Sequence, residues 1–363
     1  MSSRHVEAHT GPLRIAVDAT GGDYAPRNII DGALVAARHL GVGIIFVGVR
    51  ESIHEELRRH GDAGTLDVSV VDAPDAIDMR ESPASALRRK PRAAVRLAAD
   101  LVAKGEAVAL FSAGNTGATM LSAHRAFGRL PGVDRPALAT TIPTVGRGAV
   151  LLDSGANVEC RAQHLLQFAA MGTAYARVVL GVPRPRVGLL SIGEEETKGN
   201  ELTRETHSLL RDGTLAFVGN IEARDLYRGQ AEVIVCDGFT GNIALKVSEG
   251  LVEVVEEFLR DELNRTFGTR VGYLLSRRAF RRFRKRFDYS EVGGAPLLGV
   301  SGLCIVGHGR SSIKAVRNAL AMAYRFATRN MLSSIERELR LTTGAIIGSA
   351  SVPARVSVQW TKG

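Results

Sequence analysis

Several apolar runs in this chain end directly in clusters of Gly, Asn, Asp, Ser and Thr. The clearest clusters are residues 112–118 (SAGNTGA), 153–157 (DSGAN) and 237–242 (DGFTGN). A glycine lets the backbone approach an anion closely. The start of a following helix offers unpaired N–H groups and the positive end of the helix dipole. These clusters therefore indicate the binding of a small anion, most simply phosphate.

Three further polar clusters follow apolar runs, and each has a chemical and an ordinary interpretation. They are residues 18–23 (DATGGD), 191–200 (SIGEEETKGN) and 307–311 (GHGRS). The acids of the first could bind a cation or hold neighbouring loops, Lys198 could neutralise phosphate charge, and His308 suits proton handling or phosphate contact. Turns, a solvated acidic face and a structural histidine are the alternatives, because Gly and Asn are the usual turn residues.

Several familiar catalytic motifs are missing from the sequence. It has no GxxxxGK[ST] phosphate loop, no GxGxxG after the first expected strand, no GxSxG and no HExxH. The three cysteines, Cys160, Cys236 and Cys304, form no CxxC pair, so we expect no zinc site and no disulfide framework, and a reducing cytosol is indicated. Cys236 ends a strand, where a buried cysteine is commoner than a nucleophile.

The elements that must position these clusters alternate between short apolar runs and helical patterns. Helix-sized connections between strands predict a mainly parallel sheet covered on both faces, an α/β/α sandwich. We expect one catalytic domain over residues 13–330, with tails at 1–12 and 331–363. The expected strands are 14–18, 43–48, 66–72, 107–111, 137–142, 149–153, 187–192, 215–219, 232–236 and 302–307.

The alternation of strands and helices stops at residues 250–290. Two amphipathic helical patterns there predict a hairpin that projects from the α/β body. The second helix carries phenylalanines at positions 280, 283 and 287 beside a dense basic run. Such a helix favours an anionic membrane surface or an acidic protein, and an ordinary surface helix is the alternative. Nucleic acid is not expected, because no recognition fold frames the run. Its basic residues are Arg277, Arg278, Arg281, Arg282, Arg284, Lys285 and Arg286, and the first six are the expected contacts with the membrane or the carrier protein.

Length and charge set outer limits on these interpretations. The 363 residues suit one large or two modest domains, and 47 basic against 38 acidic residues give a net charge of +9. That excess indicates an acidic partner or serves solubility alone. The first eleven residues lack the apolar stretch of a signal peptide, and no run of about 18 uncharged apolar residues predicts a membrane span.

Taken together and in this order, the clusters resemble a known family, the acyl-carrier-protein-dependent phosphate acyltransferases of bacterial phospholipid synthesis. The resemblance runs from Leu13 to about Arg329, and one departure is Thr20, where the family usually has methionine. The matching segments are 15–26 (IAVDATGGDYAP), 112–118, 152–157, 191–195 with 198–200, 236–246 (CDGFTGNIALK), 293–299 (GGAPLLG) and 307–309.

The resemblance implies that inorganic phosphate attacks the thioester of a long-chain acyl-carrier protein, giving acyl phosphate for a membrane glycerol-3-phosphate acyltransferase. It also implies a fold similar to phosphotransacetylases and isopropylmalate dehydrogenases, a homodimer, and a cytoplasmic enzyme peripherally associated with the inner face of the cell membrane. No cofactor and no metal are expected.

Phosphate is already an oxyanion at pH 7, so such a reaction needs positioned donors and no side-chain nucleophile. We expect Lys198, His308 and Lys246 to neutralise charge and stabilise the oxyanion, with Asp153 and Asp237 orienting them. The expected phosphate-binding residues are Ser112, Asn115, Thr116, Gly117, Asn200 and Asn242.

Two other functions fit the same residues. The first is a phosphotransacetylase that uses coenzyme A, against which the basic hairpin argues. The second is a non-catalytic protein recruited to membranes. The acyl-chain preference, the lining of the acyl groove and the role of His308 as proton carrier or hydrogen-bond donor are left open by the sequence.

Overall fold

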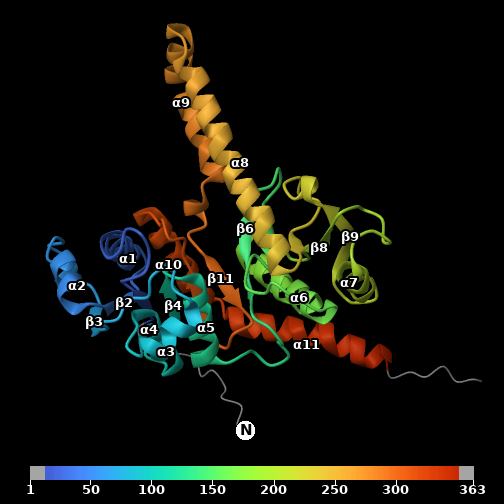
Figure 1. The fold of residues 1–363 in the computed structure, drawn as a ribbon, viewed down its shortest axis with the longest axis horizontal. Helices are drawn as coiled ribbons and strands as arrows, with labels where there is room; N and C mark the ends of the chain where they lie inside the picture. Colours follow the sequence, from blue (N-terminus) through green and yellow to red (C-terminus); the bar gives the residue numbers. More distant parts are fainter. Residues whose placement is uncertain (1–12, 351–363) are drawn as a thin grey trace, which may run out of the picture.

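The computed structural model describes residues 13–350, except the side chains of residues 284, 287, 289 and 343–350. Its strands form two sheets (Figure 1). The first sheet has seven strands in the order β3-β2-β1-β4-β12-β11-β5. These are β1 (Arg14–Asp18), β2 (Gly43–Gly48), β3 (Val68–Asp72), β4 (Ala109–Ser112), β5 (Ala137–Leu138), β11 (Ala295–Leu298) and β12 (Leu303–Val306).

The second sheet has five strands in the order β6-β7-β10-β8-β9. It contains β6 (Thr140–Ile142), β7 (Ala149–Leu152), β8 (Arg186–Ser191), β9 (Ala216–Glu222) and β10 (Val233–Val235). Only Ala139 separates β5 from β6, so the single strand expected at 137–142 is divided between the two sheets.

Most strand pairs are parallel, and this confirms the α/β fold class. The antiparallel pairs are β11 with β12, β11 with β5, and β6 with β7. In the first sheet Val17 is in register with Phe111 on β4, and Val306 is in register with Ser112. The carboxyl ends of β1, β4 and β12 therefore share one edge, where ligands bind in open α/β sheets. The carboxyl ends of β7, β10 and β8 share an edge of the second sheet in the same way.

Helix α6 packs against the second sheet. Its side chains are buried nearly all round, including Phe168 and Tyr175, and it packs on β7, β10 and α11. The helices are α1 (Arg27–Leu40), α2 (Arg50–Leu57), α3 (Pro83–Arg89), α4 (Ala94–Ala103), α5 (Thr116–Phe127), α6 (Ala162–Val179), α7 (Glu201–Arg211), α8 (Gly238–Asn264), α9 (Phe267–Phe287), α10 (Ile313–Thr328) and α11 (Met331–Ala350).

Residues 331–350 do not form a tail, in contrast to the sequence-based expectation. They form α11, which lies along α6 (Figure 1). Met331, Ile335 and Leu339 are buried, and Arg177 of α6 forms an ion pair with Glu338. Burial of this apolar stripe makes α11 part of the core. The expected tails at 1–12 and 351–363 lie outside the described residues.

Helices α8 and α9 form a hairpin that projects far from the α/β body (Figure 1). Its first helix starts at Gly238, twelve residues before the expected start of the hairpin at residue 250. Many of its large apolar side chains are exposed, among them Phe267 at 82% and Leu275 at 81%. Among residues 13–350, no helix is both long enough and apolar enough to span a membrane.

Candidate active site

At the edge of the first sheet, a buried carboxylate joins the loops that follow β1 and β4. Asp18 is 3% exposed, and its Oδ2 accepts a hydrogen bond from the Ser112 hydroxyl at 2.7 Å. Its Oδ1 accepts from the amide and the hydroxyl of Thr20 at 3.0 and 2.8 Å. Burial raises the pKa of Asp18, and the bonds from Ser112 and Thr20 oppose that rise. Asp18 and Thr20 were not among the predicted site residues, although their place at a strand end was visible.

The side chains of Ser112 and Asn115 are used inside the protein. The Ser112 hydroxyl also accepts from the Gly114 amide at 3.1 Å. The Asn115 Oδ1 caps α5 by accepting from the Ala118 amide at 3.0 Å. Its Nδ2 donates to three carbonyl oxygens, those of Asp78, Met79 and Glu81, at 3.0–3.2 Å.

What the 112–118 loop offers to a ligand is therefore mainly its backbone. A Cβ at Gly117 would lie 2.5 Å from Pro83 Cγ, so one face of this glycine is covered by α3. Thr116 is exposed at the first position of α5. An anion here would meet the N-terminal amides of α5 and the Thr116 hydroxyl, which is the usual way a helix start binds phosphate.

The loop after β12 brings His308 beside this edge. The Asp23 amide donates to the Gly309 carbonyl at 2.8 Å, which ties the loop to the residues after β1. The His308 Nδ1 accepts from the Arg310 amide at 3.1 Å, so the neutral ring carries its proton on Nε2. Burial, followed by the positive charge of Lys246, lowers the pKa of His308. The neutral imidazole is therefore favoured near pH 7.

At the edge of the second sheet, Asp153 organises its own loop. The carboxylate is fully buried and accepts from the amides of Leu138, Gly155, Ala156 and Asn157 and from the Asn157 side chain, at 2.7–3.1 Å. Burial raises the pKa of Asp153, against the effect of these bonds. With so many bonds, its role in the structure is to hold the loop in place.

The start of α8 packs tightly on that loop. Asp237 caps the helix by accepting from the amide and the hydroxyl of Thr240, both at 2.8 Å. The Gly238 amide donates to the Asn157 carbonyl at 2.7 Å, and a Cβ at Gly241 would lie 2.0 Å from the Asp153 carbonyl oxygen. Only glycine fits at this contact. Asn242 is exposed one residue further on, facing Gly155.

Helix α8 then connects the two edges. Lys246 forms an ion pair with Glu249 at 2.7 Å, and both charges act on His308. One turn later Glu253 pairs with Arg310 at 3.6 Å. The structure therefore brings together His308 and Lys246, two of the predicted catalytic residues, although the sequence places them on different elements 62 positions apart. The sequence analysis did not single out Glu249 and Glu253 on α8 or Arg310 on the loop after β12, because charged residues on helices and loops are usually solvated.

Lys198 and Asn200 lie on the loop after β8, at the edge that also carries Asp153 and Asp237. Both are exposed. The Asn200 Oδ1 caps α7 by accepting from the Thr203 amide at 2.9 Å, so this side chain already has a structural partner. The structure thus places these two residues after the end of β8, the strand beside β10.

The cysteines are poorly suited to act as nucleophiles. Burial raises the pKa of Cys160 and of Cys304 to about 12, and it raises the pKa of Cys236 well above its usual value. The Cys236 thiol donates to the Asp153 carbonyl at 3.6 Å. A thiol with a raised pKa is not ionised at neutral pH and attacks poorly. Within residues 13–350, no three His, Cys, Asp or Glu side chains gather as a metal site.

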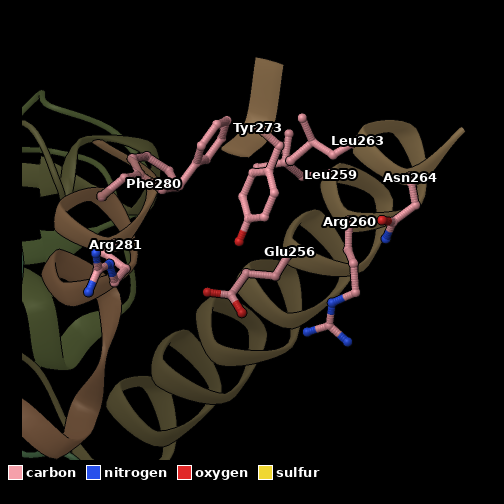
Figure 2. A pocket seen from close by; sticks show the side chains of 9 residues that line it. Glu256, Leu259, Arg260, Leu263, Asn264, Tyr273, Phe280 and Arg281 are labelled. Carbon is pink, nitrogen blue, oxygen red and sulfur yellow. The ribbon is translucent and has the colours of Figure 1, made fainter. Parts of the chain in front are cut away.

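A cavity of about 290 Å³ lies inside the hairpin, away from the strand ends (Figure 2). Tyr273 and Glu256 extend into the space between α8 and α9, and the rings of Tyr273 and Phe280 are 5.2 Å apart. The remaining lining is a mixture of apolar and charged side chains, namely Leu259, Arg260, Leu263, Asn264, Arg281 and Phe283.

The two sheets and their strand-end loops define an α/β protein with the phosphotransacetylase fold. A phosphotransacetylase from Streptococcus pyogenes superposes with a TM-score of 0.59, covering 89% of this chain and 96% of its own, at 17% sequence identity. At that identity the likeness shows the fold alone.

Sequence comparison defines the family. Residues 13–334 match the family described as fatty acid synthesis protein, and the chain belongs to it. A phosphate acyltransferase of Geobacter sp. (strain M21) is 47% identical over 90% of this chain and 93% of its own length. A phosphate acyltransferase of Acidobacterium capsulatum is 48% identical over 89% of this chain and 96% of its own.

Proposed function

We propose that this chain is an acyltransferase that moves a long-chain acyl group from the thioester of an acyl-carrier protein to inorganic phosphate. The observation that carries the proposal is the similarity to phosphate acyltransferases along nearly their whole length. The paired strand-end edges, with helix N-termini and the His308–Lys246 group, supply donors for an anion and for an oxyanion.

In the proposed reaction a phosphate oxygen attacks the thioester carbonyl carbon. The tetrahedral intermediate then collapses, the C–S bond breaks, and the carrier thiolate leaves and takes up a proton. Neutral His308, with its proton on Nε2, can donate to the oxyanion or to the leaving sulfur, and Lys246 adds positive charge beside it. No covalent enzyme intermediate is needed, because phosphate is itself the nucleophile.

The thioester carrier distinguishes two versions of this function. We favour a carrier protein because α9 presents exposed basic side chains, Arg277, Arg278, Arg281, Arg282 and Lys285, to an acidic partner. The Arg284 side chain lies outside the described side chains. A coenzyme A thioester is the alternative.

One assay separates the candidate functions. The protein is incubated with palmitoyl-carrier protein or palmitoyl-coenzyme A, with and without phosphate, and thioester loss is followed. Phosphate-dependent loss of the carrier-protein thioester supports the proposal. Loss with the coenzyme A ester alone supports the alternative, and no loss in any arm overturns both and favours a non-catalytic binding protein.

We further propose that the enzyme works at the inner face of the cell membrane and delivers acyl phosphate to a membrane glycerol-3-phosphate acyltransferase. The distal end of the hairpin exposes Phe258, Phe267, Leu274 and Leu275, and the basic run of α9 follows it toward the body. An apolar end beside a basic belt suits the surface of an anionic bilayer.

Serine substitution of Arg281, Arg282 and Lys285 together tests the membrane contact. Binding to phosphatidylglycerol-containing vesicles should fall by about a hundredfold, since each of the three basic residues contributes about 1 kcal/mol near such a surface. Vesicles of phosphatidylcholine alone serve as the control. Unchanged binding to the anionic vesicles would reject this contact.

We also propose a homodimer that covers part of α8. Exposed apolar side chains recur every four residues along this helix at Phe239, Ile243, Val247, Leu251 and Val255. Such a stripe normally has a partner surface. Light scattering after size-exclusion chromatography should give twice the 38.8 kDa chain mass, and Val247→Asp should shift it toward one chain. A wild-type protein of single-chain mass at micromolar concentration would contradict the dimer.

A further inference from the structure

The Asp18 carboxylate lies beneath the phosphate-facing loop and takes no part in the reaction proposed above. It receives hydroxyl hydrogen bonds from two loops, from Thr20 after β1 and from Ser112 at the end of β4. The Ser112 hydroxyl in turn accepts a hydrogen bond from the Gly114 amide, which extends the network into the 112–118 loop. One buried group therefore fixes the start of both loops.

The backbones of the two loops meet directly beside this carboxylate. A Cβ at Gly21 would lie 2.5 Å from the Gly114 nitrogen and 3.0 Å from Asp18 Oδ2. No side chain can be inserted there without moving one loop. The position of the 112–118 loop is thus coupled to the 18–23 loop through close packing as well as hydrogen bonds.

The far end of the 112–118 loop is fixed by a second anchor. Asn115 donates to the carbonyl oxygens of residues 78, 79 and 81 and caps α5. The first amides of α5 and the exposed Thr116, the part that an anion can reach, directly follow the Asn115 anchor. Loosening either anchor displaces these amides.

We propose that Asp18 and Thr20 are positioning residues for phosphate, with the Thr20 hydroxyl holding the carboxylate that aligns the N-terminal turn of α5. This inference rests on the proposed function and assigns the binding of the phosphate substrate to the N-terminal turn of α5. Neither residue touches phosphate. Thr20 is the better test residue, because removing its hydroxyl leaves the Asp18–Ser112 bond in place.

The test replaces Thr20 by Val, which keeps the shape and removes the hydroxyl. The KM for phosphate should rise by about threefold to tenfold, as expected for a weakened hydrogen bond to a charged group, while the KM for the acyl carrier stays unchanged. Thr20→Ser keeps the hydroxyl and should restore the wild-type KM. Thr173→Val is the matched control, because the buried Thr173 hydroxyl bonds only within α6, to the Ala169 carbonyl at 2.8 Å.

A double-mutant cycle with Ser112→Ala sharpens the test. If both hydroxyls act through Asp18, their effects on the phosphate KM will not add. The inference is overturned if Thr20→Val leaves the phosphate KM within twofold of wild type, raises both KM values equally, or behaves like Thr173→Val. It is also overturned if the two effects add.

Failure of the inference can be told apart from failure of the proposed function. A wild-type protein without phosphate-dependent turnover rejects the function, whatever the variants do. Calorimetric titration with inorganic phosphate then tests the alignment of α5 alone. Weaker phosphate binding by Thr20→Val than by wild type and Thr20→Ser supports the positioning role, and equal binding by all three rejects it.

Discussion

Each sheet ends one strand in a buried aspartate, and the two carboxylates are held in different ways. Asp153, after β7, is bonded to amides of its own loop and to the Leu138 amide of β5. Asp18, at the end of β1, is bonded to the hydroxyls of Thr20 and Ser112. A strand-end aspartate can thus build one loop or join two. Only in the second arrangement does removal of a single hydroxyl weaken the connection between two loops.

The comparison predicts the largest loss of stability at Asp153. Asp153→Ala removes the acceptor of several buried amides, each of which costs about 1–3 kcal/mol when left unsatisfied, so we expect a loss of about 4 kcal/mol or more in unfolding free energy. Urea denaturation measures it. Asp153→Asn keeps one oxygen and should lose less, which keeps the test informative if the Ala variant does not fold. If Asp153→Ala lowers the unfolding free energy by less than about 1 kcal/mol, the Asp153 hydrogen bonds do not hold the loop as proposed, and the two aspartates do not differ in this way.

Asp18→Ala should cost less, about 2 kcal/mol, because two of its donors are the hydroxyls of Thr20 and Ser112, which can turn to other acceptors more easily than backbone amides can. The same urea experiment compares it directly with Asp153→Ala. Its phosphate KM should rise as well, whereas that of Asp153→Asn should change little if that loop is only structural. Equal stability losses at the two positions would break the comparison.

The raised pKa of Asp18 gives a stability effect with a definite sign. A carboxyl whose pKa is higher in the folded than in the unfolded protein binds a proton more readily when folded. The stability it contributes is complete below the unfolded value near 3.8 and is lost as pH rises through the folded pKa. Asp18→Asn lacks this titration, so its unfolding free energy relative to wild type should increase from pH 4 to pH 7. A pH-independent difference between the two proteins would contradict the raised pKa.

The smallest predicted effects lie between the two edges, at His308. Lys246 lowers the pKa of His308 and Glu249 raises it, so Lys246→Gln should raise this pKa and Glu249→Gln should lower it. Titration of the imidazole C–H signals by NMR follows both. Shifts in the same direction in the two variants would show that neither charge acts on His308 as the geometry indicates.

The sequence predicted the strand ends well, because a buried strand and its turn are neighbours along the chain. It did not predict what the loop side chains do. The hydroxyl of Ser112 bonds to a residue 94 positions away, and Asn115 bonds to carbonyl groups 34–37 positions away. Such partners are set by tertiary packing, so these two side chains have structural partners that the sequence did not show, and their contact with phosphate stays a prediction.

Two other differences have distinct causes. Helix α11 did carry a readable signal, since Met331, Ile335 and Leu339 recur every four residues and all three are buried. The split of 137–142 between two sheets had no local signal, because β5 and β6 acquire different partners, β11 and β7, from distant parts of the chain. The charge of Lys246 lowers the pKa of His308, whereas the catalytic contribution of Lys246 stays a prediction.

Helix α8 begins at the Asp153 loop, passes His308 at Lys246 and continues to Asn264 at the far end of the hairpin. A helix rises about 1.5 Å per residue, so Lys246 and Asn264 are about 27 Å apart along one unbroken axis. Helix α8 therefore acts as a spacer of fixed length. If the hairpin end rests among lipid headgroups, acyl phosphate forms at a set height above them, and its acyl chain must cross that distance to reach the bilayer.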